Sequence, residues 1–170
     1  MGTGAGAMEG ESAQVRAPSV TLEAVGHGRK LSIDAIGAPA ALIFVGRETS
    51  ASARSVVDDI RARYPMASQV VVATIADLRG IPRLARRVAR GRMKESYDHA
   101  VARLEEGQAP EDYVLILPDW DGAVMKALGI DDLSRAVAVA VIDASGNVTG
   151  VYHGFDSASR ALALLEQARG

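Results

Sequence analysis

The chain has 170 residues, of which 48% are hydrophobic and 24% charged, with a formal charge of −2. These values are those of one ordinary globular domain without an overall charge that attracts nucleic acid or membrane. The sequence contains no cysteine, which excludes disulfides, thiolate nucleophiles and cysteine metal sites. No apolar run approaches the roughly eighteen residues that a membrane-spanning helix needs.

The N-terminal residues predict a leader followed by a short hairpin. Residues 1–15 are rich in glycine and small polar side chains and lack the basic and apolar regions of a secretory signal. We expect them to form a flexible leader to a single domain over residues 16–170, in a cytoplasmic protein. Alternating apolar residues at 20–24, a glycine turn and a second short strand at 30–33 predict an antiparallel pair.

The next segment predicts a buried strand and a helix. The apolar run at 40–45 ends at Gly46 and is typical of a strand buried on both faces. Thr49 or Ser50 is a candidate cap for a helix over residues 51–63. The apolar face of this helix, expected to face the core, contains Val56, Val57 and Ile60. Its charged residues are expected to face water: Asp58, Asp59, Arg61 and Arg63.

A second buried strand is predicted at 69–75, followed by a helical insertion at 79–107. Apolar residues recur through the insertion at helical spacing: Leu84, Val88, Met93, Tyr97, Val101 and Leu104. Gly91 predicts a kink or a break into two helices, and Gly107 predicts the C-terminal stop. This apolar stripe suits packing on the sheet or on a second copy of the chain, so a homodimer is expected.

The C-terminal third predicts two more buried strands, an edge strand and two helices. The strands are expected at 113–117, 136–142 and 148–152, the last two joined by a tight turn into a hairpin. Helices are expected at 119–128 and 156–168, the second capped by Asp156 or Ser157. A helix between successive buried strands favours parallel neighbours in one α/β sheet with flanking helices.

Several short motifs resemble peroxiredoxins and related thioredoxin-like proteins. Residues 17–22 (APSVTL) resemble the family's A-P-D-F-T-L opening, and residues 119–122 (DWDG) its D-x-D-G turn. Residues 141–148 (VIDASGNV) are similar to its V-I-D-x-x-G-x-I hairpin. The resemblance extends from about residue 16 to the C-terminus. It implies a thioredoxin-like three-layer sandwich with a mixed central sheet, an N-terminal hairpin and the long helical insertion at 79–107.

The sequence departs from this family where its redox chemistry would lie. In the family's T-x-x-C motif, Thr49 matches the threonine and the cysteine position falls on Ser52. A serine hydroxyl lacks the thiolate and the sulfur oxidation states that peroxide reduction uses. Val137 occupies the position of the usual cis-proline, and Arg135 lies two residues from the place of a family arginine. Ser52 is then either a helix cap or part of a surviving binding pocket at the helix N-terminus.

A basic stripe is the other distinctive feature. Basic residues recur every three or four positions in the insertion: Arg83, Arg86, Arg87, Arg90 and Lys94. Like charges at this spacing repel, and an anion would offset the repulsion. A solvated face, or pairing with acids elsewhere such as Asp58 and Glu105, explains the stripe equally. An acidic protein or an anionic ligand is therefore a candidate partner, and nucleic acid is disfavoured because no aromatic platform accompanies the stripe.

The remaining candidate sites are weaker. Trp120 follows a strand at the carboxyl end of the sheet, where α/β proteins bind ligands, so it either lines a pocket or covers the core. Asp119, Asp121 and Asp132 suit a cation, but an aspartate before a short helix is more simply a cap. The three histidines lack zinc spacing, and no metal or cofactor is expected.

The sequence thus favours a cysteine-less, non-redox binding or regulatory module. It would hold a partner in the former active-site groove or on the basic helix, without thiol peroxidase or oxidoreductase activity. The alternatives are an enzyme or ligand carrier of unrelated chemistry on the same fold, or a structural homodimer subunit.

Overall fold

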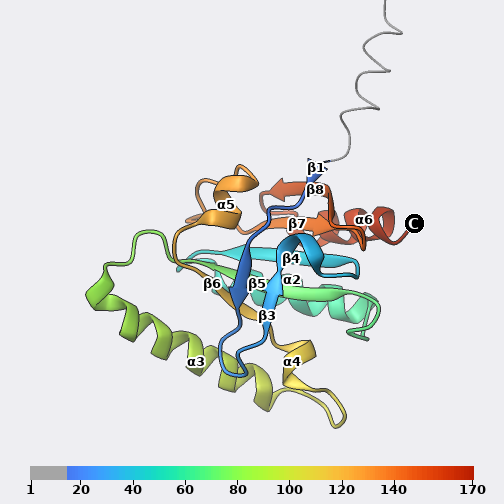
Figure 1. Ribbon diagram of the computed structural model, residues 1–170. Coiled ribbons are helices and arrows are strands. Elements are labelled where there is room, and N and C mark those ends of the chain that lie inside the picture. Colours follow the sequence, from blue (N-terminus) through green and yellow to red (C-terminus); the bar gives the residue numbers. More distant parts are fainter. Residues whose placement is uncertain (1–14) are drawn as a thin grey trace, which may run out of the picture.

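The computed structural model describes residues 15–170 and contains one six-stranded sheet with helices on both sides (Figure 1). The strand order is β1-β8-β7-β4-β5-β6, and β2 and β3 pair separately. The strands are β1 (Val15–Arg16), β2 (Thr21–Glu23), β3 (Lys30–Ser32), β4 (Ala40–Val45), β5 (Val71–Asp77), β6 (Ile116–Asp119), β7 (Ala138–Ile142) and β8 (Asn147–His153). The helices are α2 (Ser50–Arg63), α3 (Arg86–Ala102), α4 (Pro110–Tyr113), α5 (Ala123–Ala127) and α6 (Ser157–Arg169), with short 3-10 turns η1 (Ile33–Ala35) and η2 (Arg83–Ala85). The expected leader lies outside the described residues except for Val15, which lies in β1.

The sheet is mixed, as the resemblance implied. Strands β4, β5 and β6 are parallel, with Ala40 beside Val71 and Thr74 beside Ile116. The prediction of parallel neighbours is wrong for β7, which pairs with β4 in the antiparallel direction. After the edge strand β6, the chain passes β5 and β4 and forms β7 on the other side of β4. Strand β7 then runs in the direction opposite to β4. The two predicted hairpins, β2–β3 and β7–β8, are both confirmed.

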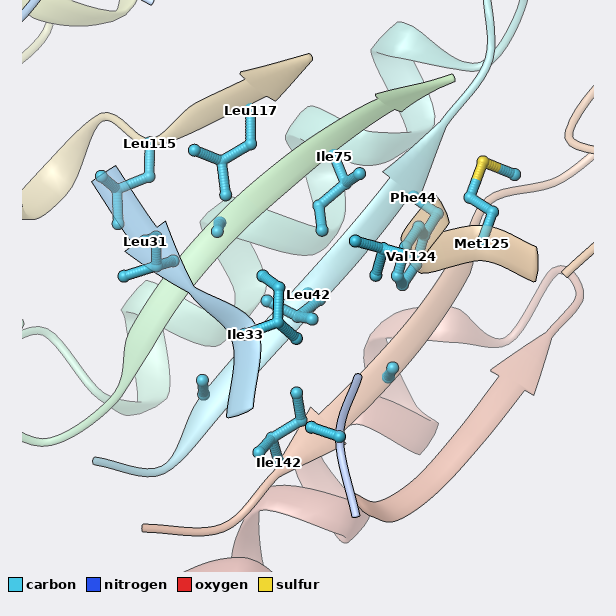
Figure 2. Packing of buried hydrophobic residues seen from close by; sticks show 14 of the residues in the cluster. Leu31, Ile33, Leu42, Phe44, Ile75, Leu115, Leu117, Val124, Met125 and Ile142 are labelled. Carbon is cyan, nitrogen blue, oxygen red and sulfur yellow. The ribbon is translucent and has the colours of Figure 1, made fainter. Parts of the chain in front are cut away.

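The core lies on both faces of the sheet because the central strands β4 and β7 are apolar at every position. Leu42 and Phe44 face one side of β4, Ala41 and Ile43 face the other, and all four are fully buried. Figure 2 shows the first side, where the β3 residue Leu31 and side chains of α5 cover the sheet. Helices α2 and α6 cover the second side. These three layers are the predicted sandwich.

Three strands of the sheet begin two or three residues later than the sequence predicts, among them β7, which begins at Ala138 instead of residue 136. The predicted strand at 113–117 begins only at Ile116, because Pro110 starts the one-turn helix α4 that includes Tyr113. The Tyr113 hydroxyl accepts a hydrogen bond from the amide of Ala67 at 3.1 Å, which fixes this turn against the loop before β5. Strand β5 begins two residues later than expected, at Val71, and continues to Asp77.

Arg61 is the one charged residue of α2 whose predicted exposure is wrong. Its Nη1 donates to three backbone carbonyls, those of Tyr64 (3.3 Å), Met66 (3.4 Å) and Val70 (2.9 Å). These carbonyls belong to the turn that follows the helix. Arg61 therefore ties the end of α2 to the start of β5 instead of facing water.

Helix α3 forms most of the predicted insertion and runs without a break through Gly91. A single glycine costs a helix about 1 kcal/mol relative to alanine, which is too little to interrupt seventeen residues. The helix ends at Ala102, five residues before Gly107. Met93 is the only buried side chain of α3. Tyr97 also packs against Gly26 and His27, so α3 contacts the body of the protein at a few points along its length.

Candidate functional site

The segment between β4 and α2 is the place that the resemblance assigns to the family's catalytic motif. Thr49 is buried, and its Oγ1 accepts a hydrogen bond from the amide of Gly46 at 2.9 Å. The same hydroxyl donates to the carbonyl of Leu133 at 3.3 Å or of Gly46 at 3.4 Å. A Cβ on Gly46 would lie 2.9 Å from the Leu133 oxygen. Thr49 thus joins the end of β4 to the segment before β7.

No side-chain oxygen caps α2, so the capping predictions for this helix are wrong. Thr49 is the N-cap residue by position, but its hydroxyl is used by Gly46 and Leu133. Ser52 lies in the first turn, is exposed, and makes no side-chain hydrogen bond within residues 15–170. Its hydroxyl is free at the surface, beside first-turn amides that are not used by a side chain.

The segment before β7 lies at the same end of the sheet. Val137 is buried, and its carbonyl accepts from the amide of Gly154 and the hydroxyl of Ser157, each at 3.4 Å. Ser157 therefore does not cap α6, and neither does Asp156. All peptide bonds in the described part of the chain are trans. Arg135 is exposed and forms no ion pair within residues 15–170.

The aspartates at the ends of β5 and β6 are committed to structural roles. Asp119 is 1% exposed and accepts from the first three amides of α5, those of Ala123, Val124 and Met125, at 3.0–3.4 Å. The helix-cap interpretation of the DWDG turn is thus confirmed for Asp119. Within residues 15–170, no three His, Cys, Asp or Glu side chains form a cluster that would hold a metal ion.

Asp77, the register partner of Asp119, forms a two-point ion pair with Arg79. Arg79 Nε and Nη2 donate to its two oxygens at 2.9 and 3.1 Å, and Arg79 also donates to the carbonyl of Asp131 at 2.6 Å. The hydrogen bond to Asp77 raises the pKa of Arg79. The Arg79 stem lies where a Cβ of Gly122 would be, 2.2 Å from Cδ, and Gly122 has φ +68°. Sequence analysis missed this pair, for which only the Asp-x-Arg spacing is a signal.

Two arginines of the basic stripe share one aromatic partner. The guanidinium carbons of Arg86 and Arg90 lie 5.0 and 5.1 Å from the centre of the Trp120 ring. The negative face of an indole attracts cations, which offsets the repulsion between the two arginines. Trp120 is half-buried beneath these arginines and is absent from the residues lining the two grooves described below.

The other members of the stripe divide into paired and unpaired residues. Lys94 pairs with Asp98 at 2.6 Å and lies over the Tyr97 ring. Arg83 and Arg87 are exposed and form no ion pair within residues 15–170. Asp58, a predicted partner of the stripe, instead pairs with Arg103 at 3.4 Å. Free positive charge is therefore concentrated at the N-terminal end of the insertion.

Two grooves lie beneath α3, and Met93 borders both. The small groove has a volume of about 310 Å³ and lies between the first half of α3 and the carboxyl ends of β4 and β5. Its wall includes Gly46, Arg47, Leu78, Val88 and Arg92. The large groove has a volume of about 1020 Å³ and lies between the second half of α3, helix α2 and strand β5.

The small groove brings together two features that the sequence placed forty residues apart. Gly46 and Arg47 begin the segment aligned with the family's catalytic motif, while Val88 and Arg92 belong to the basic helix. Pockets at the carboxyl ends of parallel strands are common ligand sites in α/β proteins. Leu84 is 98% exposed and Val88 61% exposed at the same end of the helix, so apolar surface is open to solvent beside the groove.

No helix in residues 15–170 combines the length and the apolar composition that crossing a bilayer requires. No protein-family model and no curated protein matches the sequence.

Solved structures do match, at low sequence identity. One is dsbF from MTB, in a structure of its mixed oxidized and reduced forms, with 21% identity, a TM-score of 0.60 and coverage of 88% of this chain and 95% of that one. Another is the exposed lipoprotein thioredoxin Etrx1 of Streptococcus pneumoniae, with 18% identity, a TM-score of 0.60 and coverage of 87% and 99%. A third is a putative thiol:disulfide interchange protein DsbE from Chlorobium tepidum, with 16% identity, a TM-score of 0.60 and coverage of 94% and 99%. The chain therefore has a thioredoxin-like fold in a sequence without cysteine.

Proposed function

We propose that this protein is a non-redox binding module that holds an acidic, partly apolar segment of another protein in the small groove. The observation that carries the proposal is the position of this groove, between the former catalytic segment at Gly46–Arg47 and the basic helix α3. The groove lies between the two segments that the sequence offered as alternative sites, but the predicted site residues of those segments do not line it: Thr49, Ser52, Arg83, Arg86, Arg87, Arg90 and Lys94. The absence of cysteine removes the thiol chemistry of the fold, which is consistent with a binding role.

Apolar contacts supply the attraction. Leu84 and Val88 are the most exposed large aliphatic side chains of the chain segment that borders the groove. Covering such side chains removes apolar surface from water at about 25 cal/mol per Å². An apolar side chain of a partner that enters between Leu78 and Val88 would meet this surface on both sides.

Charge complementarity selects an acidic partner. Arg47 and Arg92 line the groove, and neither forms an ion pair within residues 15–170. The one acid of the wall, Asp77, is already paired with Arg79. The groove is thus locally cationic in a protein whose formal charge is −2. Such local charge steers acidic partners and disfavours basic ones.

Selection of peptides on the immobilised protein tests the proposal. Random peptides displayed on phage should be enriched for sequences that combine Asp or Glu with a large apolar residue. Binding of a selected peptide, measured by fluorescence anisotropy, should weaken about tenfold or more in Val88→Asp and in Arg92→Glu, since each places an unfavourable charge against the peptide. Arg63→Glu is the matched control, because Arg63 is exposed on α2 and lines neither groove.

Two results would refute the proposal. If the enriched peptides lacked acidic residues, the groove would not select its partner by negative charge. Acidic peptides that bind Val88→Asp and Arg92→Glu as tightly as the parent protein would show that they bind elsewhere. Raising the salt concentration should weaken a genuine complex, because exposed charge pairs are screened.

The alternatives predict different measurements. A structural homodimer would cover Leu84 and Val88 with a second copy, so Leu84→Asp would shift the sedimentation equilibrium from dimer to monomer. An enzyme or carrier of unrelated chemistry would retain a small molecule that native mass spectrometry detects. The peroxiredoxin type of the resemblance and a cytoplasmic location stay predictions.

A further inference from the structure

The large groove differs from the small one in its walls and in its chemistry. It lies under the second half of α3, bounded by Val57 of α2, Val72 and Thr74 of β5, and Met93 and Ala100 of α3. Its volume of about 1020 Å³ is at the upper end of the range of about 300–1,000 Å³ in which proteins bind small organic molecules. Aliphatic side chains of these three elements form the apolar part of its wall, and the polar part includes Glu105 and Asp58, of which Asp58 is paired with Arg103. The space suits a flexible apolar chain rather than a compact polar ligand.

A half-buried cation forms part of the wall of the large groove. Arg61 lines it and carries no carboxylate partner within residues 15–170. Its Nη1 is saturated by three carbonyls, while its Nη2 is buried and has no hydrogen-bond partner in the described part of the chain. Burial lowers the pKa of Arg61. An unused buried donor on a guanidinium is costly and invites an acceptor.

A second arginine lies on the same side of α2. Arg54 precedes Arg61 by seven residues, which is two helical turns, and also lines the large groove. Arg54 is exposed and forms no ion pair within residues 15–170. The Tyr113 ring, which also lines the large groove, lies 5.2 Å from the Arg61 guanidinium. Arg54 is therefore the more accessible of the two cations.

We propose that the large groove binds a small amphipathic carboxylate, with its apolar chain over Val57, Val72 and Met93 and its carboxylate held by Arg54 and Arg61. A carboxylate matches the planar, forked donors of arginine and is the acceptor that Nη2 lacks. The apolar chain fills the space that α3 leaves open because Met93 is its only fully buried side chain. This site is separate from the small groove and does not depend on the peptide site proposed above.

Calorimetric titration with dodecanoate, below its micellar concentration, tests the proposal. Dodecanoate should bind with a stoichiometry of one, and dodecyltrimethylammonium, which has the same chain and the opposite charge, should bind at least about tenfold more weakly. Ala100→Phe should fill the groove and weaken dodecanoate binding by about tenfold or more, because the apolar chain loses its space. Glu95→Phe adds the same ring at an exposed position of α3 that lines neither groove, and should leave binding unchanged.

A second set of variants tests the contribution of the arginine charge separately from the volume of the large groove. Arg54→Gln should weaken dodecanoate binding about tenfold while leaving dodecyltrimethylammonium unaffected, and Arg63→Gln is its matched control. Arg61→Gln also removes the carbonyl bonds that hold the turn after α2, so Arg54 is the informative position. Val88→Asp and Arg92→Glu, which disrupt the small groove, should bind dodecanoate normally.

Three results of the titrations would overturn the proposal, and a fourth comes from the oligomeric state. The three are no heat of binding for dodecanoate, equal binding of the cationic amphiphile, and unchanged binding in Ala100→Phe. A dimer that Ala100→Phe converts to monomer would also overturn it, because a second copy of the chain would then occupy the groove.

Discussion

Replacing Asp119 tests whether the DWDG turn is a helix cap or a functional acid. Asp119→Ala removes the acceptor of three amides of α5 at 3.0, 3.2 and 3.4 Å. Val124 and Met125, whose amides are among the three, are fully buried, so water does not replace the lost oxygen there. Losing a cap costs about 1 kcal/mol, and each stranded buried donor costs about 1–3 kcal/mol.

The expected loss for Asp119→Ala is about 3 kcal/mol of unfolding free energy. For a protein of this size that corresponds to a fall in Tm of about 6–12 °C. Asp119→Asn keeps one acceptor oxygen and should lose about 1–2 kcal/mol. Urea denaturation followed by circular dichroism measures both changes.

Asp121→Ala is the matched control, because Asp121 is an exposed aspartate two residues away with no hydrogen bond within residues 15–170. It should change stability by less than about 0.5 kcal/mol. An Asp119→Ala protein as stable as the parent would refute the cap. A rise in parental Tm on adding calcium or magnesium that is absent from Asp119→Ala would instead assign the turn to cation binding.

Three further predictions concern chemistry, aromatic contacts and glycines. With a thiol reductant present, the purified protein should consume hydrogen peroxide no faster than buffer, because it has no sulfur nucleophile; sustained turnover would contradict this. The fluorescence of Trp120, the single tryptophan, should change in Arg86→Ala and in Arg90→Ala but not in Arg87→Ala; an unchanged spectrum would place the arginines off the ring. Gly91→Ala should raise the free energy of unfolding by about 1 kcal/mol, since nothing lies near the added Cβ. Gly46→Ala should lower it by about 1–3 kcal/mol, because the added Cβ meets the Leu133 carbonyl; equal effects of the two glycine changes would refute that packing.

The buried strands were predictable because they are continuous apolar runs. The run ending at Val45 and the run at Ala138–Ile142 are each buried on both faces, which a sequence pattern shows directly. The direction of β7 was not predictable in this way. The antiparallel pairing of β7 with β4 depends on where the chain between β6 and β7 crosses the sheet. The sequence of the short helix α5 in this connection does not indicate where that crossing occurs.

The candidate site was predictable only in its parts. The basic residues and the apolar stripe of α3 follow from helical spacing, but their partners do not. Arg86 and Arg90 meet Trp120 across thirty residues of sequence, and the small groove exists because α3 returns to the end of β4. The partial burial of Arg61 was not predicted because its three acceptors are backbone carbonyls. Backbone acceptors cannot be recognised from the pattern of side chains in a sequence.

Few side chains hold α3 to the rest of the molecule: Met93 is buried, Tyr97 packs against Gly26, and Arg86 and Arg90 lie over Trp120. Burying one methionine contributes about 1.5–3 kcal/mol, which is well below the total stability of about 5–15 kcal/mol expected for a domain. Even with the contacts of Tyr97 and of the two arginines added, α3 is held at few points, so we expect it to detach in a partial opening while the sheet stays folded. Detachment would merge the two grooves into one channel, so the residence time of a molecule held beneath α3 would be set by the frequency of this opening.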